Sequence, residues 1–311
     1  MGLYRGRFAP SPTGPLHFGS LIAALGSYLD ARAHGGQWLL RIEDLDVPRC
    51  SPLAAEQILR TLEAFHLYWD GEVVWQSRRT AAYAEALERL KAGSQVFACA
   101  CTRRELADSA LNEPSGLAAD GAVRYPGTCR HGLPPGKTAR AWRVGVDDAR
   151  ISFEDAVQGS VSSELATDSG DFVLRRADGL FAYQLAVVVD DAEAGITHVV
   201  RGADLLASTP RQIYLQQLLG LSQPAYAHLP VAFNTAGEKL SKQTCAPSLD
   251  VRQPTLALWA ALTFLGQQPP PELAHSSPRD CLDWALNHWH LDHVPMHAPI
   301  HATTLEKQHV D

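Results

Sequence analysis

Two short polar segments carry the side chains best suited to hold a nucleotide. His17-Phe18-Gly19-Ser20 follows a turn-rich loop, and Lys239-Leu240-Ser241-Lys242 stands more than two hundred residues later. A helix start with a glycine lets backbone N–H groups approach phosphates closely, and a lysine ammonium can follow charge that develops on phosphorus. The predicted ATP-binding residues are His17, Gly19, Lys239, Ser241 and Lys242, of which we expect His17 and Lys242 to be catalytic.

The elements that must position these side chains alternate between strand and helix. Residues 4–9 and 38–42 have the apolar pattern of strands, and residues 16–33 between them repeat apolar side chains at helical spacing. Such alternation predicts a parallel sheet with crossover helices. Ligands bind such sheets at the carboxyl ends of the strands, where the loop from Ser11 to His17 would lie.

Five blocks in order resemble the glutamyl-tRNA synthetases, which are class I aminoacyl-tRNA synthetases. The blocks are Arg7-Phe8-Ala9-Pro10-Ser11-Pro12-Thr13-Gly14 with Leu16-His17-Phe18-Gly19, Arg41-Ile42-Glu43-Asp44-Leu45-Asp46, Tyr183 with Asp190-Asp191, Thr197-His198-Val199-Val200-Arg201-Gly202, and Lys239-Leu240-Ser241-Lys242. They span roughly residues 5 to 245. Ser20 and Gln243 depart from the fullest form of the two signatures, as glutamate-type enzymes commonly do.

The resemblance implies a glutamate-binding site, and the residue types suit that substrate. Arginine binds a carboxylate through paired charge-assisted hydrogen bonds, so Arg7 is expected on the side-chain carboxylate and Arg201 on a substrate carboxylate. Glu43 offers a counter-charge to the ammonium group. The full predicted set is Arg7, Phe8, Ala9, Pro10, Ser11, Glu43, Tyr183 and Arg201.

A cysteine cluster within a segment rich in Gly, Pro and Ala predicts a structural zinc site. Cys99, Cys101 and Cys129 supply three soft ligands, whereas structural zinc takes four. The chemistry of the residues favours His131 as the fourth ligand, while the resemblance implies Tyr125. Three free buried thiols are the alternative.

The predicted fold is α/β: a Rossmann-type parallel sheet of the class I synthetases, with an inserted zinc-binding subdomain and a short helical C-terminal region. The expected divisions are 1–95 and 139–245 for the two halves of the catalytic domain, 96–138 for the zinc-binding insert, and 246–311 for the C-terminal region. Only 69 residues follow Lys242, so we expect no helical anticodon-binding domain after it.

An activation site without that domain resembles the glutamyl-queuosine tRNA(Asp) synthetases. This family implies activation of L-glutamate by ATP and Mg²⁺ without tRNA, then transfer to queuosine in the anticodon of tRNA(Asp). One alternative is a truncated glutamyl-tRNA synthetase that charges the terminal ribose of tRNA(Glu). The others are an enzyme that transfers activated glutamate to a non-RNA acceptor such as a carrier protein, and a non-catalytic, zinc-stapled RNA-binding relative.

Composition sets the remaining expectations. The net charge of −7 excludes a generally basic nucleic-acid-binding chain, so an RNA partner would need a local positive face. No apolar stretch approaches the roughly 20 residues that span a bilayer. We therefore expect a cytoplasmic protein that does not associate with membranes. A monomer is the expected oligomeric state, although composition does not determine it.

Overall fold

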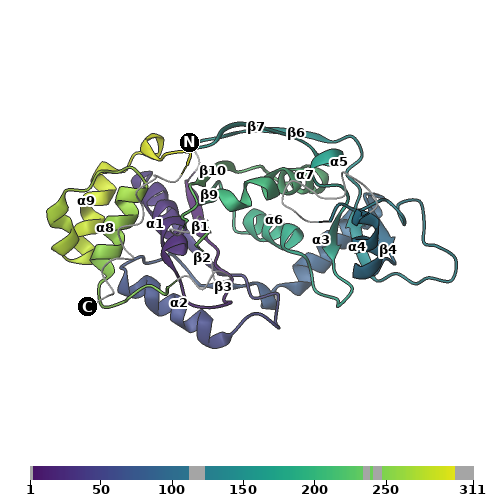
Figure 1. Ribbon diagram of the computed structural model, residues 1–311, viewed down its shortest axis with the longest axis horizontal. Helices are drawn as coiled ribbons and strands as arrows, with labels where there is room; N and C mark the ends of the chain where they lie inside the picture. The colour runs from purple at the N-terminus through teal and green to yellow at the C-terminus, as the bar shows by residue number, and fades with distance from the viewer. Residues whose placement is uncertain (1–2, 112–122, 234–238, 241–246, 298–311) are drawn as a thin grey trace.

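The computed structural model describes residues 3–111, 123–233, 239–240 and 247–297 (Figure 1). Its first three strands form a parallel sheet in the order β1-β2-β3. Their bounds are Arg5–Phe8 for β1, Gln37–Ile42 for β2 and Val74–Trp75 for β3. These strands and their crossovers follow the predicted alternation.

A second group of strands continues the fold beside β1. The strands β9 (His198–Gly202) and β10 (Ala225–Leu229) pair in parallel. The backbone N–H of Thr197 donates to the carbonyl of Arg5 at 2.9 Å, which links the two groups of strands. The carboxyl ends of β1, β2, β9 and β10 therefore open toward one region of the molecule.

The helices that connect these strands bury their apolar faces against them. Leu21, Ile22, Leu25 and Leu29 are buried on α1, at the spacing that predicts this helix. The helices of this part are α1 (Phe18–Ala33), α2 (Pro52–Ala64), α3 (Thr80–Ala92), α6 (Tyr183–Glu193) and α7 (Thr209–Leu219), with short 3₁₀ turns η1 (Gln76–Arg78) and η2 (Ala203–Ser208).

A small antiparallel sheet carries the cysteine-bearing segment. It has the order β4-β5-β8, with bounds Val96–Cys99, Ala141–Val144 and Phe172–Arg175, and α4 (Arg103–Leu111) follows β4. Cys99, Ala100, Tyr125, Cys129 and Ala141 form a separate small core there. The segment lies at the end of the molecule opposite α8 and α9 (Figure 1). The expected divisions at 95/96 and 138/139 stay predictions.

The C-terminal region packs against α1. Its elements are α8 (Pro254–Phe264), η3 (Pro271–His275), α9 (Pro278–His288) and η4 (Leu291–His293). Trp289, just after α9, donates its indole N–H to the buried Asp30 carboxylate of α1 at 3.1 Å. In the described ranges, no helix is both long and apolar enough to cross a bilayer.

One hairpin is an addition to the predicted pattern. The hairpin β6 (Arg150–Asp155) and β7 (Gly159–Glu164) leads into the short α5 (Leu165–Asp168), and β6 pairs with β10 at Tyr226 and Asp155. Serine-rich β7 has the composition of a loop and becomes a strand by pairing with β6. This pairing brings Asp155 beneath the cavity described next.

Candidate active site

One cavity of about 890 Å³ lies at the carboxyl ends of the parallel strands. Its lining comes from the loop after β1, the residue after β2, the end of β9 and the segment after β10. Every predicted glutamate-binding residue lines it: Arg7, Phe8, Ala9, Pro10, Ser11, Glu43, Tyr183 and Arg201. Of the predicted ATP-binding residues, His17, Gly19 and Lys239 line it as well. Ser241 and Lys242 lie outside the described residues.

At one end of the cavity lies the charged cluster, formed by Arg7, Arg41, Glu43, Asp190 and Asp191. Arg7 on β1 is 4% exposed, and its Nη2 lies 3.1 Å from an oxygen of Asp191 on α6. Arg41 on β2 contacts the other Asp191 oxygen at 2.6 Å. Burial alone would raise the pKa of Asp191, but Arg41 and Arg7 lower it to about 2. Asp191 is thus an ionised anchor for both arginines.

Asp190 anchors the same cluster from the next position of α6. Its carboxylate accepts from Gln76 Nε2 at 2.7 Å, Arg79 Nε at 2.6 Å and the Tyr83 hydroxyl at 2.9 Å. It also lies 3.7 Å from Nε of Arg41. Adjacent carboxylates of one helix therefore tie α6 to β1, β2 and the start of α3.

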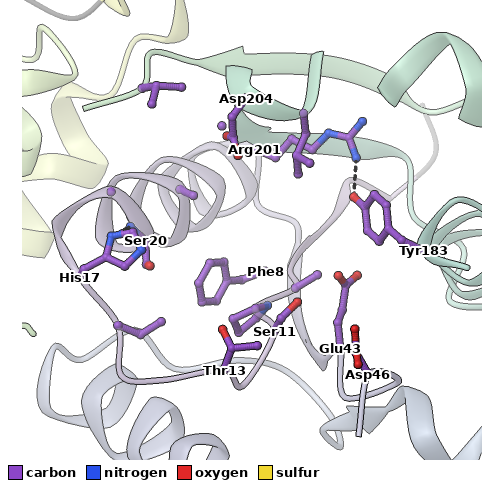
Figure 2. A pocket seen from close by; sticks show the side chains of 18 of the residues that line it. Phe8, Ser11, Thr13, His17, Ser20, Glu43, Asp46, Tyr183, Arg201 and Asp204 are labelled. Atoms are coloured by element: carbon purple, nitrogen blue, oxygen red, sulfur yellow. Dashed lines mark hydrogen bonds between the residues drawn. The ribbon is translucent and has the colours of Figure 1, made fainter. Parts of the chain in front are cut away.

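Glu43 directs a carboxylate into the cavity just past the end of β2. Its side chain is 9% exposed and lies 3.1 Å from Arg41 Nη2. Burial raises the pKa of Glu43, although Arg41 and Arg7 oppose the shift. Figure 2 shows the Glu43 carboxylate and the Tyr183 hydroxyl directed toward the same part of the cavity. A cationic group of a ligand would favour the ionised form of Glu43.

Arg201 on β9 lies in a different environment, here called the neutral cradle. Its guanidinium donates to four uncharged acceptors, which are His228 Nε2 at 3.1 Å, Tyr183 Oη at 3.2 Å, Thr209 Oγ1 at 2.8 Å and Gln212 Oε1 at 2.8 Å. Arg201 is 5% exposed, and no carboxylate among the described residues forms an ion pair with it. A buried guanidinium without a counter-ion attracts an anionic ligand.

Arg201 cannot offer a carboxylate the paired hydrogen bonds that were expected of it. Four of its five N–H bonds are given to the neutral cradle, which leaves one Nη1 proton without a protein acceptor in the described part of the chain. Tyr183 accepts from Arg201, so its own hydroxyl proton can be donated elsewhere. Burial raises the pKa of Tyr183, which keeps that proton in place. Together the two side chains can give a carboxylate two donors.

The other end of the cavity is the start of α1. His17 is the N-cap, and its Nδ1 accepts from the backbone N–H of Ser20 at 3.3 Å. A neutral imidazole that accepts at Nδ1 carries its proton on Nε2. A Cβ at Gly19 would lie 3.2 Å from the carbonyl oxygen of Leu240. Gly19 therefore lets the histidine and lysine segments pack together.

Lys239 is held at the rim of this end. Its ammonium lies 2.7 Å from a carboxylate oxygen of Asp204, which follows β9. Leu240 donates its backbone N–H to Ala232 after β10 at 2.8 Å. The segment that leads into Ser241 and Lys242 thus begins beside the cavity.

The cysteine cluster is compact enough to hold a metal ion. The sulfurs of Cys99, Cys101 and Cys129 lie within 4.8 Å of one another. Cys101 and Cys129 sulfurs are 3.7 Å apart, and the Tyr125 hydroxyl lies 3.6 Å from Cys99 and 3.8 Å from Cys101. Zn–S bonds near 2.3 Å at tetrahedral angles put sulfurs about 3.8 Å apart. His131 is exposed and is not a member of this group.

Several buried residues that hold the cavity-lining side chains in place carried no predicted role. Arg41, Asp190 and Asp191 stand inside the blocks quoted above. Each is a charged residue among apolar neighbours in the sequence, and this pattern could have indicated a buried functional role. Asp155 and His228 stand in no block and are brought to Arg201 only by the pairing of β6, β10 and β9.

Comparison with known proteins agrees with this geometry. Residues 4–269 match the family model of the tRNA synthetases class I (E and Q), catalytic domain. The glutamyl-Q tRNA(Asp) synthetase of Aromatoleum aromaticum is 64% identical over 94% of this chain and 90% of the relative. That of Dechloromonas aromatica is 62% identical over 94% of this chain and 96% of the relative.

Solved structures of glutamate-type synthetases share the fold of this chain. The glutamate-tRNA synthetase of Elizabethkingia anophelis superposes with a TM-score of 0.78 at 26% identity, over 97% of this chain and 69% of that chain. A glutamate tRNA ligase from Elizabethkingia meningosepticum in complex with its amino acid gives 0.77 at 26% identity, over 97% and 68%. The chain therefore belongs to the class I tRNA synthetases of the E and Q type and, within them, to the glutamyl-Q tRNA(Asp) synthetase family.

Proposed function

We propose that this chain activates L-glutamate with ATP, without tRNA, and transfers the glutamate to the queuosine base of tRNA(Asp). The observation that carries the proposal is the single cavity in which carboxylate-binding and phosphate-binding side chains meet. Arg7, Glu43, Tyr183 and Arg201 lie at one end, and His17 lies at the other. High identity to glutamyl-Q tRNA(Asp) synthetases supports the choice of acceptor.

Glutamate has two carboxylates and one ammonium, and each has a counterpart in the cavity. We assign the side-chain carboxylate to Arg7 and a substrate carboxylate to Arg201 with Tyr183. Glu43 faces the ammonium, and Ser11 adds a neutral hydrogen bond. Arg7 and Arg201 are held by protein partners before substrate arrives, so little side-chain entropy is lost on binding.

In the activation step, an oxygen of the glutamate α-carboxylate attacks the α-phosphorus of ATP. The bond from that phosphorus to the bridging oxygen breaks, and pyrophosphate leaves with the electron pair. We assign the His17 side chain to a phosphate oxygen of ATP, and we assign Lys242, from its motif, to the charge that develops. Mg²⁺ bound with ATP neutralises phosphate charge.

In the transfer step, a hydroxyl oxygen of the queuosine cyclopentenediol attacks the activated carbonyl carbon. The bond between that carbon and the phosphate oxygen breaks, the hydroxyl proton is lost, and AMP leaves. The product is a glutamyl ester of the base. We assign no side chain as general base, because the phosphate of the adenylate can accept this proton itself.

Two assays test the proposal. Glutamate-dependent exchange of labelled pyrophosphate into ATP is expected in the absence of RNA. Labelled glutamate is then expected on tRNA(Asp) that contains queuosine, and not on the same tRNA without it. Exchange that requires tRNA would overturn the first step, and label on the terminal ribose of tRNA(Glu) would overturn the second.

We also propose that Cys99, Cys101, Cys129 and Tyr125 hold a structural Zn²⁺. The support is the spacing of three sulfurs and a phenol oxygen on a small core that buries little apolar surface. Tyr125→Phe removes the oxygen ligand, while His131→Ala removes the alternative one and serves as the matched control. We expect only Tyr125→Phe to lower the zinc content after dialysis against a weak chelator; the opposite pattern would transfer the role to His131.

A further inference from the structure

Behind Arg201 lies a buried chain of polar groups to which no role has been assigned. The side chains of Asp155 on β6 and His228 on β10 have no exposed surface, and Nδ1 of His228 lies 2.6 Å from Asp155 Oδ2. The other carboxylate oxygen, Oδ1, accepts three backbone N–H groups, from His228 at 3.0 Å, Val157 at 3.0 Å and Gln158 at 2.9 Å. Asp155 is therefore immobilised and in turn immobilises the imidazole.

The contacts determine which nitrogen of His228 carries the proton. Arginine Nε can only donate, so the 3.1 Å contact requires His228 Nε2 to accept from Arg201. The proton of the neutral ring is then on Nδ1, where it is donated to Asp155. Burial lowers the pKa of His228, Asp155 opposes this shift and Arg201 adds to it.

We propose that His228, oriented by Asp155, is a positioning residue that supplies the acceptor for Arg201 Nε and thereby aims the guanidinium at a substrate carboxylate. The inference rests on the assignment of Arg201 to glutamate binding made above. Without this acceptor the guanidinium keeps its bonds to Tyr183, Thr209 and Gln212 but loses the bond that holds Nε. The plane of the group can then tilt, so the remaining Nη1 proton is directed less well. The residue would act on substrate affinity and would not touch the reacting atoms.

Two substitutions at this one position separate the bond at Nδ1 from the contacts at Nε2, which faces both Arg201 Nε and, at 3.0 Å, Thr209 Oγ1. The amide nitrogen of His228→Asn can take the place of Nδ1 and keep the bond to Asp155. This variant leaves Nε of Arg201 without its acceptor. The amide oxygen of His228→Gln reaches the place of Nε2 and keeps the acceptor. A purely structural role predicts that Asn is the milder change, while the positioning role predicts that Gln is.

The measurement is tRNA-independent pyrophosphate exchange with glutamate and ATP varied separately. We expect His228→Asn to raise the KM for glutamate about 10-fold, with kcat and the KM for ATP little changed, as loss of one hydrogen bond to a charged group predicts. His228→Gln should stay within about 3-fold of the parent. Equal KM values for the two variants, or a larger KM for Gln, would overturn the proposal.

Asp155→Asn gives a second, independent variant. Its amide N–H₂ can face Nδ1 and force the ring proton onto Nε2, toward Arg201, so its KM for glutamate should rise as in His228→Asn. Thermal melting checks that each variant is folded. Arg201→Met separates failure of the glutamate assignment from failure of the positioning role. A parental KM for glutamate in Arg201→Met would refute the assignment of Arg201 to glutamate. A raised KM in Arg201→Met together with a parental KM in His228→Asn would refute only the positioning role of His228.

Discussion

Arg7 and Arg201 are both buried arginines on parallel strands of one cavity, yet the protein holds them in opposite ways. In the charged cluster, Arg7 shares the ionised Asp191 with Arg41. In the neutral cradle, Arg201 donates to uncharged acceptors, and the Asp155 carboxylate acts on it through His228. The two guanidiniums are therefore similarly buried, but only the charge of Arg7 is balanced by a carboxylate among the described residues.

With two kinds of arginine, one cavity combines rigidity with attraction for an anion. An ion-paired arginine is firmly placed, but part of its charge is already neutralised. An arginine held by neutral acceptors keeps its charge for the ligand and depends on those acceptors for its direction. A dicarboxylate such as glutamate would meet one of each kind.

The largest expected effect comes from removing either guanidinium. Arg7→Met and Arg201→Met should each lower kcat/KM for glutamate in pyrophosphate exchange by at least about 100-fold, because a buried, charge-assisted contact to the substrate is lost. The folds should respond unequally, since Arg7→Met leaves Asp191 with Arg41 alone. We expect a lower melting temperature for Arg7→Met than for Arg201→Met. Equal melting temperatures would mean that the two environments do not differ as described.

A smaller effect concerns stability in acid. The pKa of Asp191 is lowered to about 2 in the folded chain, below its unfolded value of roughly 3.9. The unfolded state binds more protons between these values, so the contribution, on the order of 2 kcal/mol, is present above pH ~4 and lost as pH falls toward 2. The free energy of unfolding, measured with urea, should rise as the pH increases from 3 to 6, and Asp191→Asn should make this rise smaller. The same rise with pH in the variant would refute the ionised anchor.

The smallest effect belongs to the neutral cradle and falls at a higher pH. The folded pKa of His228 lies below its unfolded value of about 6.5, so its contribution is present above that pH and declines as pH falls below it. The charged and titratable groups that face the ring are Asp155, Arg201, Arg7 and the phenol of Tyr226. His228→Gln should remove this component of the unfolding free energy between pH 6.5 and 5. Its persistence in the variant would assign the component to another group.

Much of the cavity could be predicted because its residues follow strand ends directly. Arg7 is on β1, Glu43 follows β2 and Arg201 is on β9, so the rule that parallel strands end at one edge brings them together. The start of the helix at His17 and Gly19 could be predicted from the helical spacing of the apolar residues that follow. Domain divisions and the roles of individual site residues stay predictions.

The rest depended on partners distant in the chain. Asp155 lies on a hairpin whose second strand is rich in serine and has the composition of a loop, and it reaches His228 across 73 residues. No local period signals such a pairing, because the hydrogen bonds of a strand are made with a neighbouring strand.

The amino-acid order alone determined the alternation of strands and helices, the ends where ligand-binding side chains stand, and the types of those side chains. The folded arrangement decided which arginine is neutralised and which keeps its charge. The physical reason is that residue type sets the charge of a group, whereas the pKa, the tautomer and the direction of a buried group depend on the neighbours that packing places around it.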